Sequence, residues 1–209
     1  MKWNECTGFY KAYLSLGSTC QTAYQLKRLG LRQFAGPLDW FISDSVPDLV
    51  QLIRKRFYGF MEFDHLQLID RTYDHFVVRD SDYEVVSFHD FPRYLTIERV
   101  WDAYPPFKGK IDRRVQRFLK TARFSSPVLL VRTQTSRKEA IQLKAALNTM
   151  MYGKYRLLIV NNHSSGLNSV VHEDWGIDGV CSVNVPSGRD WRGSDQAWNT
   201  IMKGFMLSH

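Results

Sequence analysis

The sequence predicts an α/β (or α+β) fold in which a mixed sheet is flanked by helices. In its second half, apolar β-prone runs at 128–132 and 155–161 enclose a helical stretch at 137–150. Strand, helix and strand in this order are typical of a parallel crossover unit. In the first half, β-prone runs at 75–79 and 83–88 surround a short polar turn, which predicts an antiparallel hairpin.

The N-terminal part predicts a short strand at 12–16, which Gly17 ends, followed by the first helix. Ser18 is a good N-cap, and Gln21 three residues later completes a capping box. Gly30 stops this helix. We therefore expect residue 20 at the second helical position.

A second helix is expected from about Val46, with Pro47 in its first turn. Residues 58–73 are aromatic-rich, and we expect them to be irregular. Pro105, Pro106 and Gly109 mark the best internal breakpoint. Beyond it we expect a helix with an apolar stripe, a last strand at 180–185, and a closing helix that Ser194 caps and that continues through Phe205. The stripe consists of Ile111, Val115, Phe118, Leu119 and Ala122.

Composition favours a single α/β domain over residues 1–209, with lobes at 1–104 and 109–209. The 44% hydrophobic content of these 209 residues is enough for one core, and 23% charged residues argue against general disorder. No apolar run approaches the ~20 residues that cross a bilayer, and the N-terminus lacks the apolar stretch of a secretory signal. We therefore expect a cytoplasmic protein with no membrane partner.

Three cysteines, an odd number without a CxxC pair, argue against a disulfide framework and against structural zinc. His163, His172, Glu173 and Cys181 match no metal-site spacing, so we expect no metal and no cofactor. The net charge of +7 favours an anionic substrate or partner. Nucleic acid is disfavoured, because no zinc finger, KH loop or RNP-like segment is present. The sequence carries no signal for an oligomeric state.

Cys20 is the candidate nucleophile because it begins the first predicted helix. Free N–H groups and the positive end of the helix dipole favour a thiolate there, and can lower its pKa from about 8.5 into the ~3.5–7.5 range. The backbone from Ser18 through Thr19 to Cys20 could also stabilise an oxyanion. The alternative is a small residue that packs beneath the first helical turn.

A cysteine nucleophile needs an imidazole within hydrogen-bond reach, usually oriented by a carboxylate or an amide. His89, which follows an apolar run at the end of the hairpin, is the candidate base; the alternative is a strand-end histidine bonded to backbone. Asp39, in an apolar stretch, either orients the imidazole or caps a turn. Asp90 is adjacent to His89 and should point to the opposite face. Asn161 and Asn162 lie at a strand end after the histidine and are the amide candidates.

The helix predicted from Ile111 is strongly basic. Arg113 and Arg117 lie four residues apart, a like-charge pair that is unfavourable unless an anion lies between them. They could clamp a carboxylate or a phosphate, or belong to a solvated outer face.

Two N-terminal segments resemble the opening of a bacterial family described as putative papain-like cysteine peptidases of unknown function. They read SLGSTCQTAYQLKRLG at 15–30 and PLDW at 37–40. The FHDF block at 88–91, the segments at 113–118 and 128–132 and the tail around Trp191 and Trp198 are similar too. The resemblance implies that Cys20 is the nucleophile and His89 its base, on a papain-like fold. Asn161 and Asn162 follow papain's chain order of Cys, His and Asn.

The leading hypothesis is a cysteine hydrolase or acyltransferase that acts on an amide, ester or thioester of a small molecule or peptide. Peptidase, amidase and acyltransferase share one acyl-cysteine intermediate. The rival hypothesis is a phosphate- or nucleotide-binding α/β protein, such as a sugar-transferring enzyme, with the 16–21 loop as the phosphate cradle. That loop lacks the Walker lysine spacing and GxGxxG.

Overall fold

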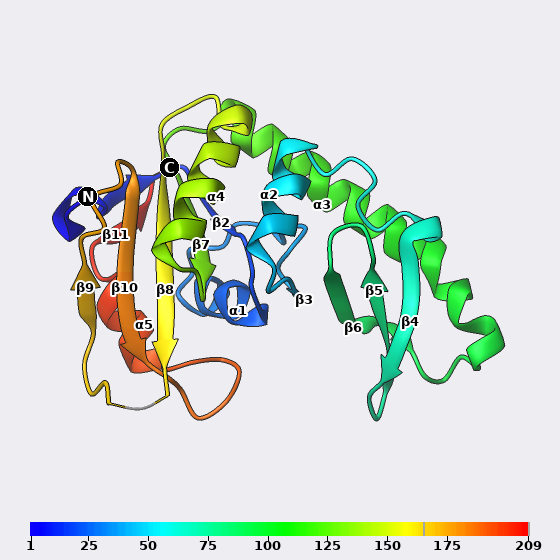
Figure 1. Ribbon diagram of the computed structural model, residues 1–209. Coiled ribbons are helices and arrows are strands. Elements are labelled where there is room, and N and C mark those ends of the chain that lie inside the picture. Colours follow the sequence, from blue (N-terminus) through cyan, green and yellow to red (C-terminus); the bar gives the residue numbers. More distant parts are fainter. Residues whose placement is uncertain (165, 209) are drawn as a thin grey trace.

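The computed structural model describes residues 1–164 and 166–208, and it confirms an α/β fold with helices around mixed sheets (Figure 1). The five-stranded sheet has the order β2-β7-β8-β10-β9. Its strands are β2 (Ala12–Ser15), β7 (Val128–Thr133), β8 (Tyr155–His163), β10 (Val180–Pro186) and β9 (Val171–Glu173). The first four run parallel, and β9 lies antiparallel at the edge. The predicted crossover unit is confirmed, with α4 (Arg137–Met150) between β7 and β8.

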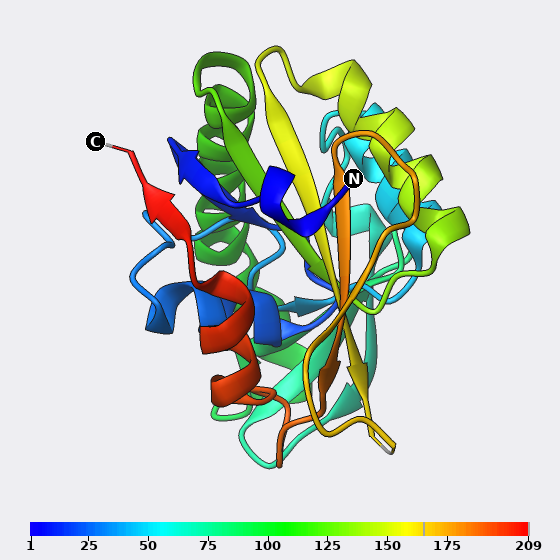
Figure 2. The ribbon, with the colours of Figure 1, turned by 90° about the vertical axis from the view of Figure 1, so that its left-hand side faces the viewer.

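Alternating side chains of the central strands build two hydrophobic cores. In β7, Val128 and Leu130 pack into one core, whereas Leu129 and Val131 pack into the other. Because neighbouring residues of a strand face opposite sides, a strand buried on both faces is apolar throughout. Helices α2 (Val46–Arg54) and α4 cover one face, and α1 (Cys20–Arg28) and α5 (Asp195–Met202) cover the other (Figure 2).

A second, antiparallel sheet of four strands has the order β3-β6-β5-β4. Its strands are β3 (Phe41–Ile42), β6 (Val85–Pro92), β5 (His75–Asp80) and β4 (Leu66–Arg71). The hairpin prediction is confirmed, although its second strand begins at Val85 and runs past His89. The prediction that 58–73 is irregular is wrong for 66–71, where β4 pairs with β5 along the edge. Only Leu66 of β4 is buried, so this strand has no apolar alternation to reveal it.

Helix α3 (Tyr104–Phe124) runs along both sheets (Figure 1), and it follows a 3-10 helix, η3 (Ile97–Ala103). The predicted breakpoint at Pro105 and Pro106 is wrong, because both prolines lie in the first turn of α3. Proline is compatible with that turn, where the backbone N–H groups have no intrahelical partner. Strand β2 from the first half pairs with β7 from the second, so the five-stranded sheet draws on both predicted lobes.

The two chain ends meet in a small parallel sheet of β1 (Gly8–Tyr10) and β11 (Phe205–Leu207). Two 3-10 helices complete the elements, η1 (Trp3–Glu5) and η2 (Phe63–His65). The closing helix α5 ends at Met202 rather than continuing through Phe205, since Gly204 turns the chain with φ 94° into β11. Over residues 1–164 and 166–208, no helix has both the length and the apolar character needed to cross a membrane.

Candidate active site

A cleft of about 940 Å³ opens where the parallel strands β2, β7, β8 and β10 end. In open α/β sheets, ligands bind outside the carboxyl ends of the strands. One wall comes from these ends and the start of α1, and it contributes Thr19, Cys20, Gln21, Thr133, Gln134, Asn162, Ser187, Gly188, Asp190, Trp191 and Gly193. The other wall comes from the antiparallel sheet and α3, and it contributes Trp40, Ile42, Thr72, Asp74, Phe88, His89, Asp90, Lys110 and Arg114.

Cys20 is the first residue of α1, one position earlier than expected. The predicted Ser18 cap is wrong: Thr19 is the N-cap, and its hydroxyl accepts the Gln21 N–H at 3.3 Å. The Ser18 hydroxyl instead lies 3.0 Å from Thr133 Oγ1 in the buried interior, so Ser18 does not line the cleft whereas Thr19 does. The end of the helix agrees with prediction, since Gly30 follows it with φ 70°.

Burial raises the pKa of the Cys20 thiol above its ordinary value. The backbone N–H of Cys20 opposes this by lowering the pKa, as expected at a helix start, but the carboxylates of Asp39 and Asp90 raise it further. Without a base to accept its proton, Cys20 is therefore a neutral thiol near neutral pH, and not the thiolate expected from the helix dipole. Ionisation then requires a base that takes the proton.

A buried arginine holds the segment that leads to Cys20. Arg132 of β7 is fully buried, and its guanidinium donates to Leu16 O at 2.7 Å and to Ser43 O at 2.6 Å. Burial lowers its pKa to about 10, still well above neutral pH. The Ser43 N–H donates to Ser18 O at 2.7 Å. These bonds fix the path of the chain from β2 to α1, and so the position of the sulfur.

His89 lies in the middle of β6, and its side chain is exposed to the cleft. Over the described residues, no hydrogen bond joins its ring to Cys20 or to a carboxylate. Its nearest ring is that of His75, with centroids 6.0 Å apart at 82°. His75 Nδ1 in turn lies 3.0 Å from Asp74 Oδ1. The structure thus places the candidate nucleophile and the candidate base on opposite walls of one cleft.

Among the described residues, none of the four candidates for the third group, Asp39, Asp90, Asn161 and Asn162, forms a side-chain hydrogen bond or ion pair with the His89 ring. Asp39 is buried; its carboxylate pairs with Arg32 at 2.5 Å and accepts the Gly36 N–H at 2.9 Å. Burial raises the Asp39 pKa, and Arg32 opposes this shift. Of the two roles predicted for Asp39, the geometry matches the turn cap and not the orienting group.

The remaining candidates also have other partners. Asp90 accepts from Ser87 Oγ at 2.6 Å and forms an ion pair with Lys110. Asn161 exchanges two hydrogen bonds with the backbone of Thr135, at 2.9 and 3.1 Å.

The side-chain amides of Asn162 and Gln21 form two hydrogen bonds near the N-terminus of α1. Asn162 donates to Gln21 at 2.8 Å, and Gln21 donates to Asn162 at 3.3 Å. Both residues line the cleft. They join α1 to the end of β8, a link that sequence spacing does not reveal because 141 residues separate the two.

The basic helix presents a different pair of cations to the cleft from the one expected. Arg113 and Arg117 are exposed and do not line it, and Arg117 stacks over the Phe34 ring at 5.5 Å. Lys110 and Arg114 line it instead. They are four residues apart, and each adjoins a residue of the apolar stripe, Ile111 or Val115. This adjacency does not single them out in the sequence, because Arg117 also adjoins a residue of the stripe, Phe118.

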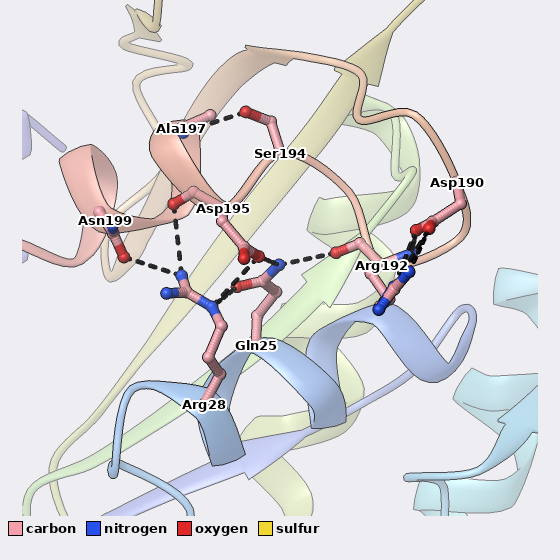
Figure 3. Close-up of polar contacts among 8 residues, drawn as sticks. All are labelled: Gln25, Arg28, Asp190, Arg192, Ser194, Asp195, Ala197 and Asn199. Atoms are coloured by element: carbon pink, nitrogen blue, oxygen red, sulfur yellow. Dashed lines mark hydrogen bonds and ion pairs between the residues drawn. The ribbon is translucent and has the colours of Figure 1, made fainter.

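The loop after β10 closes one end of the cleft with Trp191 and Gly193. Gln25 of α1 holds this loop by donating to Arg192 O at 2.7 Å and to Asp195 at 2.8 Å (Figure 3). Arg28 extends the contact to Asn199 of α5 at 2.8 Å (Figure 3). The polar side of α1 is therefore occupied by the chain's own C-terminal part, which leaves its N-terminus to face the cleft.

The histidines of the polar cluster His163, His172, Glu173 and Cys181 each have a separate partner. His163 Nε2 lies 3.1 Å from Asn184 Oδ1, and His172 stacks on Trp3 with ring centroids 4.1 Å apart. Within the part of the chain that the structure describes, no three His, Cys, Asp or Glu side chains are gathered as metal ligands would be.

Comparison with known proteins gives one relative, the "Uncharacterized protein R408" of Acanthamoeba polyphaga mimivirus. It is 36% identical over 121 residues, which covers 51% of this chain and 54% of the relative. The chain therefore matches about half the length of this relative. Because the relative is viral, it does not support the expected restriction to bacteria. No solved structure matches the fold significantly.

A family model matches residues 11–166, a span that contains both Cys20 and His89. Its description is "Putative papain-like cysteine peptidase", which agrees with a cysteine hydrolase at a coarse level. The match covers well over half of the 209 residues. This chain belongs to that family.

Proposed function

We propose that the cleft carries out acyl transfer with Cys20 as nucleophile and His89 as general base, on an amide, ester or thioester. The observation that carries the proposal is that Cys20, at the start of α1, and His89, in β6 of the antiparallel sheet, line the same cleft although they lie far apart in the sequence. The family description adds that a cysteine hydrolase is the expected class.

The chemistry follows from the protonation state of the sulfur. His89 takes the thiol proton as sulfur attacks the substrate carbonyl, and a C–S bond forms. The tetrahedral oxyanion is stabilised by the Cys20 N–H at the start of α1. The leaving amine, alcohol or thiol receives the proton from the imidazolium. Water then hydrolyses the acyl-cysteine, or a second nucleophile accepts the acyl group.

Because the pKa of Cys20 is raised, the proposed reaction needs His89 to remove the thiol proton. A neutral thiol is a weak nucleophile, so a buried cysteine without a partner base would be inert near pH 7. A nearby imidazole is the side chain that most often accepts such a proton as general base. The exposed position of His89 lets its ring reach toward the cleft without breaking a buried hydrogen bond.

Intact-mass measurement after incubation with a panel of thioesters and activated amides tests the proposal. We expect an acyl adduct on the wild type that maps to Cys20, none on Cys20→Ala, and slower formation on His89→Gln. His163→Gln, outside the cleft, is the matched control and should behave as wild type. Adducts that form equally on Cys20→Ala would contradict the proposal.

A second candidate function also has a specific observation in its favour. The loop from Gly17 to Gln21 lies at the carboxyl end of β2 and leads into the N-terminus of α1, where phosphate groups commonly bind in α/β proteins. A nucleotide- or phosphate-binding protein would use backbone N–H groups rather than the sulfur. Cys20→Ser separates the two: phosphate binding should survive, whereas acyl transfer should be almost lost.

We also propose that the protein works in a reducing compartment such as the cytoplasm. All three cysteines are free, including the buried Cys6 and Cys181.

A further inference from the structure

We propose that the substrate of this cleft carries an anionic oxygen group, a carboxylate or a phosphate-type group, which the guanidinium of Arg114 binds. The inference rests on the proposed function, because it names the substrate class of the same cleft. The observation behind it is a different one from that behind the proposed function, and it concerns the cleft wall opposite Cys20.

Arg114 is a half-buried cation that has no partner among the described residues. It projects from α3 into the cleft lining, and burial lowers its pKa. Over the described residues, its guanidinium makes no hydrogen bond, ion pair or ring contact. A guanidinium that has lost part of its hydration is unfavourable unless its donors are satisfied. The arrangement therefore favours a ligand that supplies the missing acceptors.

The carboxylates near Arg114 are already engaged. Asp39 is paired with Arg32, and Asp90 is paired with Lys110 and Ser87. Both carboxylates attract Arg114 electrostatically, but neither forms a hydrogen bond with it. The same two carboxylates also act on the Cys20 thiol. The sulfur and the guanidinium therefore lie within the electrostatic range of common neighbours.

The other charges that line the cleft are paired as well. Asp190 bonds Arg192 at 2.6 Å, and Asp74 lies 3.0 Å from His75. Arg114 is thus the cation that remains available for a ligand among the described lining residues. A planar guanidinium matches the two oxygens of a carboxylate or phosphate, so one arginine is enough to orient such a group.

Matched alkylating reagents test the inference at Cys20. N-iodoacetylglycine carries a carboxylate, and N-iodoacetylglycinamide is its neutral counterpart; the β-alanine pair extends the spacer by one carbon. N-iodoacetyl-aminomethylphosphonate and its dimethyl ester form the phosphate-type pair. Peptide mass spectrometry gives the rate at Cys20 for each reagent. The ratio of anionic to neutral rate is the readout, so a loss of folding that slows both reagents does not change it.

We expect Arg114→Gln to lower this ratio by about tenfold or more for at least one spacer, because a charge-assisted hydrogen bond is lost. Arg114→Lys should keep part of the preference. Arg113→Gln, its exposed neighbour on the same helix, should change nothing. The reagent pair with the larger effect distinguishes a carboxylate from a phosphate-type group. Equal ratios in the wild type and in Arg114→Gln, for every pair, would overturn the inference if equilibrium binding of the anions also proves independent of Arg114.

Equilibrium binding separates this outcome from failure of the acyl chemistry. N-acetylglycine and N-acetyl-aminomethylphosphonate, which cannot alkylate, are titrated into wild type and Arg114→Gln by calorimetry. Binding that depends on Arg114 supports the anion site whatever the reactivity of Cys20. If Cys20 alkylates no faster than Cys6 and Cys181, that result contradicts the proposed acyl transfer but not the anion site. Absence of Arg114-dependent binding, together with equal ratios, overturns the site and leaves the thiol chemistry standing.

Discussion

The two walls of the cleft are built in opposite ways. On the Cys20 wall, the segment that leads to Cys20 is held by buried side chains. Arg132 donates a hydrogen bond to Leu16 O, and the hydroxyl groups of Ser18 and Thr133 are hydrogen-bonded to each other. On the His89 wall, the imidazole is exposed, and its closest aromatic neighbour is a second histidine, His75. The position of the sulfur is therefore set by the fold, whereas the imidazole keeps its freedom to rotate.

This difference follows from where each residue sits in its sheet. Cys20 follows a parallel strand that is buried on both faces, and the loop that leaves such a strand must satisfy its polar groups internally. His89 belongs to an antiparallel strand with one face toward solvent, where exposed side chains need no partner. A preorganised nucleophile with an adjustable base is the arrangement that we infer for this cleft.

The largest expected effect is a loss of stability on the Cys20 wall when Arg132 is replaced. Arg132→Met should leave the carbonyl groups of Leu16 and Ser43 unsatisfied in the interior, and should lower the free energy of unfolding by about 3 kcal/mol. Urea denaturation measures this change. Arg113→Met, on the exposed face of α3, is the control and should stay within about 0.5 kcal/mol of wild type. An equally small effect for Arg132→Met would mean that the wall does not depend on this residue.

An intermediate effect is expected from Asp39→Asn, which weakens the pair with the largely buried Arg32. The free energy of unfolding should fall by about 2 kcal/mol, as for loss of a charge-assisted hydrogen bond. Because the Asp39 carboxylate raises the Cys20 pKa, its removal should lower that pKa and speed alkylation of Cys20 near neutral pH.

The sign of this change in alkylation is the informative part. If Asp39 oriented the His89 imidazole, Asp39→Asn would slow the reaction instead of speeding it. Asp102→Asn, which removes an exposed partner of Arg99, serves as the control for stability and should cost less than about 0.5 kcal/mol.

The smallest expected effect concerns the His89 wall. Lys110→Gln removes the ion pair with Asp90, but the lysine side chain is 37% exposed, so the free energy of unfolding should change by only about 0.5 kcal/mol. A double-mutant cycle with Asp90→Asn gives the coupling between the two residues. A coupling as large as the Arg132 effect would show that this wall is as firmly built as the other.

Much of the fold could be predicted because its signals are local. The crossover from β7 through α4 to β8 and the hairpin of β5 and β6 appear as apolar periodicity and turn residues. Strand β4 could not be found in this way, since its register depends on pairing with β5. The start of α3 could not be found either, since a Pro-Pro pair is typical of a break and is equally compatible with a first helical turn.

The candidate site was predictable in its residue types but not in its contacts. The capped helix start identified Cys20. The hairpin identified His89, but its predicted place at a strand end is wrong, because β6 continues to Pro92. The cap itself shifted to Thr19, because the Ser18 hydroxyl found a partner 115 residues away in Thr133. Charge counting along α3 selected Arg113 and Arg117, whereas the three-dimensional path of that helix turns Lys110 and Arg114 into the cleft.

The pH dependence of Cys20 alkylation by iodoacetamide, compared between wild type and His89→Gln, tests the account most directly. Burial and nearby carboxylates raise the thiol pKa, so the variant should react at Cys20 only under alkaline conditions. The wild type should begin to react at lower pH, where the imidazole can hold the proton. Superimposable profiles for the two proteins would contradict the pairing of Cys20 with His89.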